Sequence, residues 1–163
     1  MGRIFSHTEI FAEQTFTKNF AMMLAHQDMK VIHVSTHVSL KKACELVKKE
    51  RVLIVIRLAH KVLKALGICV PKIGVAGLNP HAGENGLFGD EEQKEIIPAI
   101  NQAISEGIVV EGPIPPDTIF AKSKGGQYDI AVAMYHDQGH IPMKVAAFCY
   151  DEKSDLWTSI SGV

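Results

Sequence analysis

Apolar and polar positions along the chain follow two repeating patterns, one typical of buried strands and the other of amphipathic helices. Short apolar runs of strand length lie at residues 20–25, 30–36, 73–78, 108–110 and 130–134. Apolar residues recur at helical spacing within residues 40–47, 50–66 and 90–106, and a rigid turn at residues 112–118 leads into another short helix. Only a few polar residues separate the first two runs, which predicts neighbouring strands joined by a tight connection. Strands that alternate with helices favour the α/β class.

Local signals at the ends of these segments support the assignment. Ser39 is suited to cap the helix that follows it, and Gly67 is suited to end the long helix at residues 50–66. The acidic residues 90–92 stand where a helix N-terminus favours negative charge. These signals agree with the periodicity and strengthen the prediction of three helices.

The two ends of the chain carry weaker patterns. Residues 7–12 are expected to start a helix. Residues 145–150 and 156–160 flank the charged turn 151–155 and are expected to form a hairpin.

Tyr128–Lys144 is the stretch in which chemistry is most concentrated. Its apolar run at residues 130–134 has the composition of a buried strand. The polar residues that follow are Tyr135, His136, Asp137, Gln138, His140 and Lys144. Ligands of parallel α/β sheets bind outside the carboxyl ends of the strands, so a functional site is expected here. The alternative is a polar loop that simply follows a core strand.

Three histidines, His37, His81 and His136, each follow an apolar run. If the preceding strands are parallel, all three imidazoles project from one edge of the sheet. Three imidazoles with open positions left for substrate are a common catalytic metal arrangement. The alternative is that each histidine caps a loop or bonds to a neighbouring backbone group, since no local spacing motif joins them.

The other basic side chains are expected to play lesser roles. His140 is close enough in sequence to His136 to contact it without being a metal ligand itself. His33 and His60 are expected to be packed or surface residues. Lys144 is a cation that would suit a phosphate or carboxylate, or else a solvated surface lysine.

Composition narrows the class of protein. The 163 residues have a formal net charge of −1 and are 47% hydrophobic, as expected for one globular α/β domain over residues 1–163. Basic residues are dispersed, so no nucleic-acid-binding surface is predicted. No apolar stretch is long enough to span a bilayer, and no signal peptide is recognised. Three cysteines without CxxC spacing fit a reducing cytoplasm, the expected location.

Two common nucleotide motifs are absent from the sequence. The glycines near residue 86 lack the Gly-Lys-Ser/Thr ending of a P-loop. No GxGxxG follows the first strand, so a Rossmann dinucleotide site is not supported and no cofactor-binding residue is assigned.

The motif set resembles a known family, that of the 4-hydroxythreonine-4-phosphate dehydrogenases. The matching segments are HTE at residues 7–9, THVSL at 36–40, GLNPHAGE at 77–84, PDT at 116–118 and MYHDQG at 134–139. Residues 86–88 and 139–144 look more like the branch that acts on D-threonate or D-erythronate 4-phosphate.

The resemblance implies an isocitrate/isopropylmalate dehydrogenase-like α/β/α architecture, incomplete in this chain, and a homodimer with a shared active site. It implies a divalent metal (Zn, Mg, Mn or Co) held by His37, His81 and His136, the last supplied by the partner chain. NAD would be the redox cofactor for oxidation of a 4-phosphorylated hydroxy acid, followed by loss of carbon dioxide.

By the same matching, His7 and Thr8 would contact the substrate and Lys144 its phosphate. Asp117 would lie near the reacting centre, and Asp137 is the second candidate catalytic carboxylate. No nucleic acid or membrane partner is implied.

The chain departs from the family pattern at its ends. Ser6 stands where the family has glycine, the motifs begin almost at Met1, and the sequence stops at residues 161–163 where the family continues. The chain therefore looks like the central part of a longer two-domain dehydrogenase. Two rival functions are a non-catalytic metal- or phosphate-binding dimerisation fragment and an NAD-independent metal-dependent hydrolase or lyase.

Overall fold

The computed structural model describes residues 10, 13–27, 29–152 and 156–158. The strands are β1 (Met23–His26), β2 (Met29–His33), β3 (Ile73–Ala76), β4 (Val110–Ile114), β5 (Ile130–Ala133), β6 (Cys149–Asp151) and β7 (Leu156–Thr158). The helices are α2 (Leu40–Leu46), α3 (Lys49–Ala65), α4 (Ile97–Ser105), α5 (Pro116–Lys124) and α6 (His136–Ala147). Two short helical segments, η1 (Pro80–Gly86) and η2 (Glu92–Ile96), lie between β3 and α4.

Five strands form one sheet in the order β1-β2-β5-β3-β4. The β1–β2 pair is antiparallel, whereas β2–β5, β5–β3 and β3–β4 are all parallel. The α/β class is therefore confirmed, and so is the tight connection between the first two strands. Because β2, β3 and β5 are parallel, their carboxyl ends meet at one edge of the sheet.

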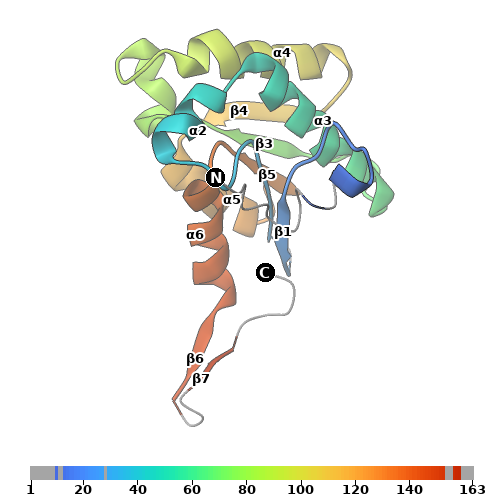
Figure 1. Cartoon of the computed structure of the whole chain (residues 1–163), viewed down its shortest axis with the longest axis vertical. Coiled ribbons are helices and arrows are strands. Elements are labelled where there is room, and N and C mark those ends of the chain that lie inside the picture. Colours follow the sequence, from blue (N-terminus) through green and yellow to red (C-terminus); the bar gives the residue numbers. More distant parts are fainter. Residues whose placement is uncertain (1–9, 11–12, 28, 153–155, 159–163) are drawn as a thin grey trace.

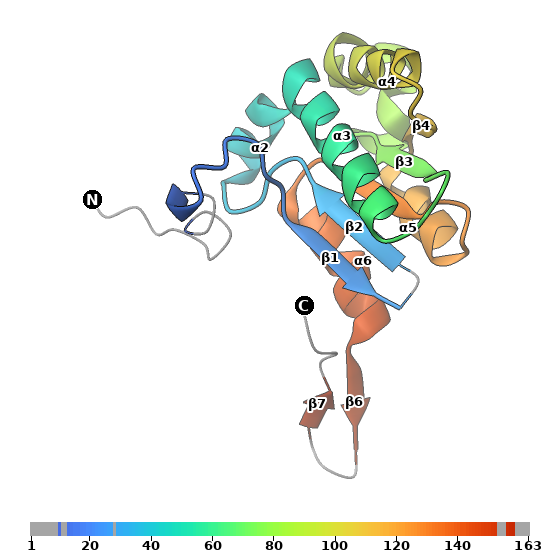
Figure 2. The ribbon, with the colours of Figure 1, turned by 90° about the vertical axis from the view of Figure 1, so that its right-hand side faces the viewer.

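Helices cover both faces of this sheet. Figure 1 shows α3 and α4 on one side of the strands and α5 and α6 on the other, and Figure 2 shows the same layers from the side. The β6–β7 hairpin extends away from the layers at the end of α6. Within the described ranges, no helix has the length and apolarity needed to cross a membrane.

Strand β5 explains why two separate cores form. Ile130 and Val132 pack with the α3 and α4 side chains, whereas Ala131 and Ala133 pack with Phe120 and other residues of the opposite layer. This alternation follows from the period of two in a strand. The large side chains face one layer and the small ones the other, so α6 can pack closely against the sheet.

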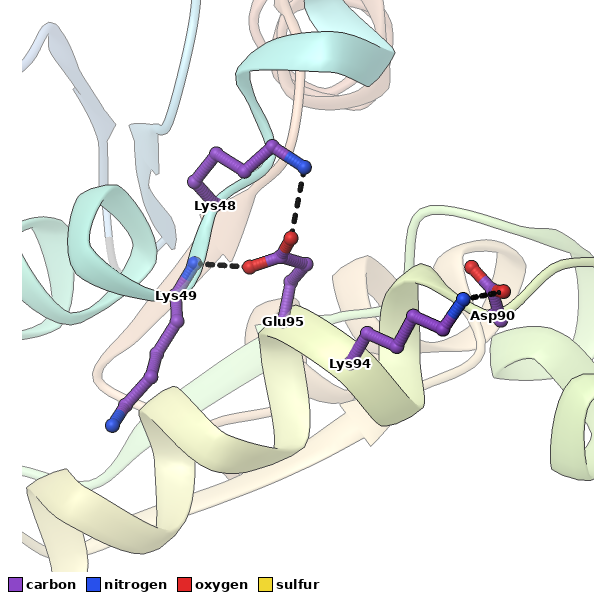
Figure 3. A network of polar contacts seen from close by, with 5 residues as sticks. All are labelled: Lys48, Lys49, Asp90, Lys94 and Glu95. Atoms are coloured by element: carbon purple, nitrogen blue, oxygen red, sulfur yellow. Dashed lines mark hydrogen bonds and ion pairs between the residues drawn. The ribbon is translucent and has the colours of Figure 1, made fainter.

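A carboxylate from a neighbouring segment caps the long helix α3. Glu95 accepts hydrogen bonds from the Lys48 ammonium and from the backbone N–H of Lys49, both at 2.8 Å (Figure 3). The side chain of the N-cap residue Lys48 does not bond to a backbone group of the helix, so Glu95 satisfies one of the free N–H groups at the start of the helix instead. The Lys48 ammonium lowers the pKa of the Glu95 carboxyl. Lys94 and Asp90 form a neighbouring ion pair one turn apart (Figure 3).

Arg51 fastens the segment before β1 to the end of β2. Its guanidinium donates to the carbonyl oxygens of Val34 and Phe20, each at 2.9 Å. Burial lowers the pKa of this group below its ordinary value.

Several segments differ from the sequence-based expectations. The helix expected at 90–106 begins as the π-helical η2 and continues as α4. Pro98 has no N–H to donate to the carbonyl four residues earlier, and a wider turn accommodates that missing bond. Strand β4 occupies 110–114 rather than 108–110. The helix start expected at residues 7–12 falls almost wholly outside the described residues.

The largest correction concerns the polar stretch after β5. It is not a loop but the helix α6, which contains Pro142 and continues to Ala147. The strand expected at 145–150 is therefore reduced to β6, although its pairing with β7 is confirmed. Proline and glycine within this stretch hid the helix, because both are poor helix formers.

Close packing of α6 on the sheet depends on Gly139. A Cβ atom at this position would lie 2.3 Å from His33 Nε2 and 2.7 Å from Val31 Cγ1. We expect Gly139→Ala to lower the free energy of unfolding by about 1–3 kcal/mol in urea denaturation, because the overpacking outweighs the gain in helix propensity.

Gly125→Ala is the matched control for this substitution. Its Cβ would meet nothing closer than 3.4 Å, so a change within about 0.5 kcal/mol is expected. Equal stabilities for the two variants would contradict the close approach of α6.

Candidate functional site

Three hydrogen bonds tie together the carboxyl ends of β2, β5 and β3. Ser35 Oγ donates to the carbonyl of Met134 at 3.1 Å. The Gln138 side chain accepts from the Met134 N–H at 2.6 Å and donates to the carbonyl of Gly77 at 2.8 Å. Gln138 is buried in the first turn of α6, so one side chain fixes both the helix start and two strand ends.

A cavity of about 410 Å³ opens at this edge of the sheet. Its lining residues are Thr36, His37, Val38, Ser39, Leu40, Ala43, Tyr135, His136 and Asp137. The His37 and His136 rings lie beside each other here, with centroids 5.6 Å apart and planes tilted by 50°. Ser39 caps α2 as expected, accepting a bond from the Lys42 N–H at 3.3 Å, and so fixes the start of the helix that borders the cavity.

Asp137 determines which His136 nitrogen carries the proton. His136 Nδ1 lies 2.6 Å from Asp137 Oδ1, and a carboxylate oxygen can only accept, so Nδ1 carries the proton. The lone pair is then on Nε2. A carboxylate that holds a histidine in one tautomer is the usual support of a metal-binding imidazole.

A column of imidazoles runs from this cavity into the core. His136 and His140 stack with ring centroids 3.6 Å apart and planes 12° from parallel. His140 then contacts His33, with centroids 4.7 Å apart. His140 lies one helical turn after His136, so the stacking follows from their spacing of four residues.

His33 is the buried end of the column, with 1% of its surface exposed. Its Nδ1 donates to the carbonyl of Met22 at 3.2 Å, and its Nε2 has no hydrogen-bond partner among the residues that the structure describes. Burial lowers the pKa of His33 to about 4, with a smaller contribution from the neighbouring imidazoles. Burial likewise lowers the pKa of His140. The inner part of the column is therefore neutral at pH 7.

The two candidate carboxylates share a second cavity, of about 510 Å³, between α5 and α6. Asp117, in the first turn of α5, and Asp137 both line it, among mainly apolar neighbours such as Phe120 and Ile141. Tyr135 and Asp137 belong to both cavities, which places this second cavity beside the histidine pair.

His81 lies apart from the other two histidines. It lines a third cavity of about 300 Å³ and contacts Phe88, with ring centroids 6.1 Å apart. Five consecutive residues, His81–Asn85, have positive φ, and four of them are not glycine. Left-handed backbone costs an L-residue roughly 1–2 kcal/mol, so surrounding contacts must hold this turn.

Two of the three histidines expected to hold a metal lie together within one chain. The described residues bring His37 and His136 together but contain no group of three or more histidines, cysteines or carboxylates placed to hold one ion. His81 as a third ligand remains a prediction.

The candidate substrate-binding residues lie outside these cavities or outside the described residues. Lys144 is exposed in the last turn of α6, on the same helix face as His136 and His140, and lines none of the three cavities. His7 and Thr8 lie outside the described residues.

This arrangement can be compared with known proteins. Residues 3–151 match the family of the pyridoxal phosphate biosynthetic protein PdxA. The chain belongs to this family. Because this match covers nearly all of the sequence, the resemblance based on the GLNPHAGE and MYHDQG segments is confirmed.

Individual relatives agree with the family match. The chain is 53% identical over 145 residues to the D-threonate 4-phosphate dehydrogenase of Salmonella typhimurium, covering 89% of this chain. It is 51% identical over 138 residues to the 4-hydroxythreonine-4-phosphate dehydrogenase of Beijerinckia indica, covering 85% of this chain. The crystal structure of 4-hydroxythreonine-4-phosphate dehydrogenase from Klebsiella pneumoniae superposes with a TM-score of 0.83 at 48% identity over 86% of this chain.

These PdxA relatives have the isocitrate dehydrogenase-like fold, and the expected architecture is thereby confirmed. The chain spans less than half of their length: 44% of the Salmonella protein, 41% of the Beijerinckia protein and 42% of the Klebsiella chain.

Sequence reasoning missed three residues that shape the site in this PdxA family chain. From the sequence, Gln138 is predicted only as part of a polar cluster, Glu92 only as an acid at a helix start, and His33 only as a packed or surface residue. A glutamine three residues after a helix cap is a known signal for side-chain bonding to the backbone before the helix. The signal at Gln138 is hard to read from the sequence, because Gly139 and Pro142 follow it and disfavour a helix.

The low pKa of His33 predicts a specific loss of stability in acid. The unfolded chain takes up a proton at His33 near pH 6.5, whereas the folded chain does so only near pH 4. The neutral imidazole therefore makes its full contribution to the free energy of unfolding above pH 6.5. This contribution is lost as the pH falls toward 4. Urea denaturation at pH 7 and pH 4.5 should show a loss of about 2–3 kcal/mol from this group.

His33→Asn keeps a donor for Met22 but cannot titrate in this range, so its acid-induced loss should be smaller by that amount. His60→Asn, on α3, is the control and should retain the full loss. If His33→Asn lost as much stability as the unmodified chain, His33 would not be the group responsible.

Proposed function

We propose that this chain carries the metal- and substrate-binding half of a metal- and NAD-dependent dehydrogenase for a 4-phosphorylated hydroxy acid. The substrate class would be 4-phospho-hydroxythreonine, D-threonate 4-phosphate or D-erythronate 4-phosphate, oxidised at a secondary alcohol and then decarboxylated. The observation that carries this proposal is the pair His37 and His136, which line one cavity at the carboxyl ends of β2 and β5 with ring centroids 5.6 Å apart. Dehydrogenase relatives at about 50% identity support it.

The donor set fits a divalent cation. His37 is exposed at the cavity, and His136 presents Nε2 because Asp137 holds its other nitrogen. His81 would be the third ligand of a site shared between two copies of the chain. The nearness of His37 and His136 within one chain supports taking this pair from one copy, in place of the partner-supplied His136 that the resemblance implies. A divalent ion would act as a Lewis acid toward the substrate hydroxyl and stabilise negative charge that develops on oxygen.

Proton transfer would fall to the two carboxylates. Asp117 and Asp137 line one cavity, directly beside His136. A carboxylate in this position can accept the hydroxyl proton of a substrate bound at the histidine pair.

The substrate phosphate would bind farther along α6. Lys144 follows His136 by eight residues on the same helix face, and two helical turns separate them by about 12 Å. An ammonium at that point would neutralise the phosphate of an extended substrate. His7 and Thr8 would contribute additional substrate contacts, and NAD would bind largely through the part of the relatives' length that this chain does not span.

Two rival functions each have one supporting observation. A metal-dependent hydrolase or lyase that needs no NAD is favoured by the pair of carboxylates beside the histidines. A non-catalytic binding fragment is favoured by the short length relative to dehydrogenase relatives. Substrate turnover with and without NAD distinguishes all three functions.

The metal site can be tested on the 163-residue chain itself. Elemental analysis after dialysis against zinc should find about one ion per chain, and light scattering should give the mass of a dimer. His136→Ala should lose the bound ion, because it removes one of two neighbouring imidazoles. His60→Ala should bind as much zinc as the unmodified chain. A metal-free monomer would argue against a shared site.

Turnover is a separate prediction. With NAD and D-threonate 4-phosphate or D-erythronate 4-phosphate, absorbance at the wavelength of NADH should rise only if the fragment retains cofactor binding. Asp137→Asn should lower any such rate by at least about 100-fold, because it weakens both the proposed proton transfer and the orientation of His136. Substrate consumption without NADH would favour the hydrolase or lyase.

A further inference from the structure

Glu92 is a buried carboxylate at the centre of the loop that presents His81. Only 2% of its surface is exposed. Oε1 accepts hydrogen bonds from the backbone N–H groups of Leu78 at 2.8 Å and Asn79 at 2.7 Å. The other oxygen accepts from the Asn79 side-chain amide at 2.9 Å. The carboxylate therefore binds the two residues between the end of β3 and the turn.

The left-handed turn wraps around the same carboxylate. A Cβ atom at Gly83 would lie 2.7 Å from Glu92 Oε2. One at Gly77 would lie 3.2 Å from Oε1 and 2.8 Å from the Cα of Ala82. Both glycines are therefore in close contact with Glu92 or with the turn, and the carboxylate fills the space between the strand end and the turn.

Glu92 lies on a helical segment that is anchored in the core. It begins the π-helical η2, whose next residues pack into the core through Ile96, which is fully buried. A carboxylate fixed in this way can hold the positive φ angles of His81–Asn85, which most of these residues would not adopt unaided.

We propose that Glu92 is the positioning residue for His81: its carboxylate fixes the left-handed turn that directs this imidazole toward the metal site. The role of this turn in metal binding rests on the proposed function. The fixing of the turn by the Glu92 carboxylate does not. Glu92 would act through backbone geometry and would not touch metal or substrate.

Glu92→Gln tests this role with almost no change in size. The amide keeps one acceptor oxygen, but its NH₂ group faces the Asn79 amide, so the hold on the turn is weakened. Glu95→Gln is the matched control, since it alters a carboxylate on the same segment that bonds to Lys48 and Lys49 instead.

The first readout is NMR of the metal-free chain. Positive φ gives a strong intraresidue NOE between the amide proton and Hα, and we expect these signals at His81–Asn85 to weaken in Glu92→Gln and to persist in Glu95→Gln. Unchanged signals in Glu92→Gln would overturn the proposal.

The second readout is Co²⁺ titration followed by visible absorption. Glu92→Gln should weaken Co²⁺ binding about tenfold or more and alter the absorption spectrum, while Glu95→Gln should match the unmodified chain. If the unmodified chain binds Co²⁺ and Glu92→Gln binds it equally well, the link from Glu92 to the metal is refuted. If the unmodified chain binds no Co²⁺ that depends on His81, the proposed function fails, and the NMR result alone decides the role of Glu92.

A second pair of variants covers the case in which Glu92→Gln does not fold. Gly83→Ala forces a Cβ against Glu92, whereas Gly86→Ala places one at similar positive φ with nothing closer than 3.6 Å. Gly83→Ala should disturb the NOE pattern at His81 and Ala82 more than Gly86→Ala. Equal effects would show that strain alone, and not contact with Glu92, controls the turn.

Discussion

One buried glutamine holds the functional edge of this sheet together. Gln138 bonds both to the N–H at the end of β5 and to the carbonyl just after β3, so the two strand ends and the start of α6 cannot move independently. Ser35 joins the end of β2 to the same point. Parallel strands leave their last backbone groups without partners in the sheet, and a buried polar group without a partner is costly. The same bonds that satisfy this requirement bring His37 and His136 to one cavity.

The two layers of helices contribute unequally to the site. The α3 and α4 layer packs large aliphatic side chains and forms the larger of the two cores. The α5 and α6 layer packs against small residues such as Ala131 and Ala133, and it carries Asp117, Asp137 and the stacked imidazoles. Because the side chains on this face of the sheet are small, polar groups of α6 can approach the strands closely. This explains how His33 of β2 can contact His140 of α6.

Much of the fold could be predicted from the sequence, because its signals are local. The aliphatic runs of β2, β3 and β5 and the periodicity of α3 needed no tertiary information, and the motif segments identified the family. The parts that could not be predicted depend on distant partners. Helix α6 forms although it contains Gly139 and Pro142, because packing against β2 overrides their low helix propensity. Glu92 and Glu95 are both acids near a helix start, and only the tertiary structure separates the one that shapes a loop from the one that caps α3.

The guanidinium of Arg51 has a consequence for the segment that precedes it. By binding the carbonyls of Phe20 and Val34, it anchors that segment beside the carboxyl end of β2. Because one guanidinium holds both carbonyls, the entry to β1 and the exit from β2 keep a fixed spacing at the edge of the sheet that carries His37. A single half-buried cation thus sets the point at which the chain joins the functional edge of the sheet.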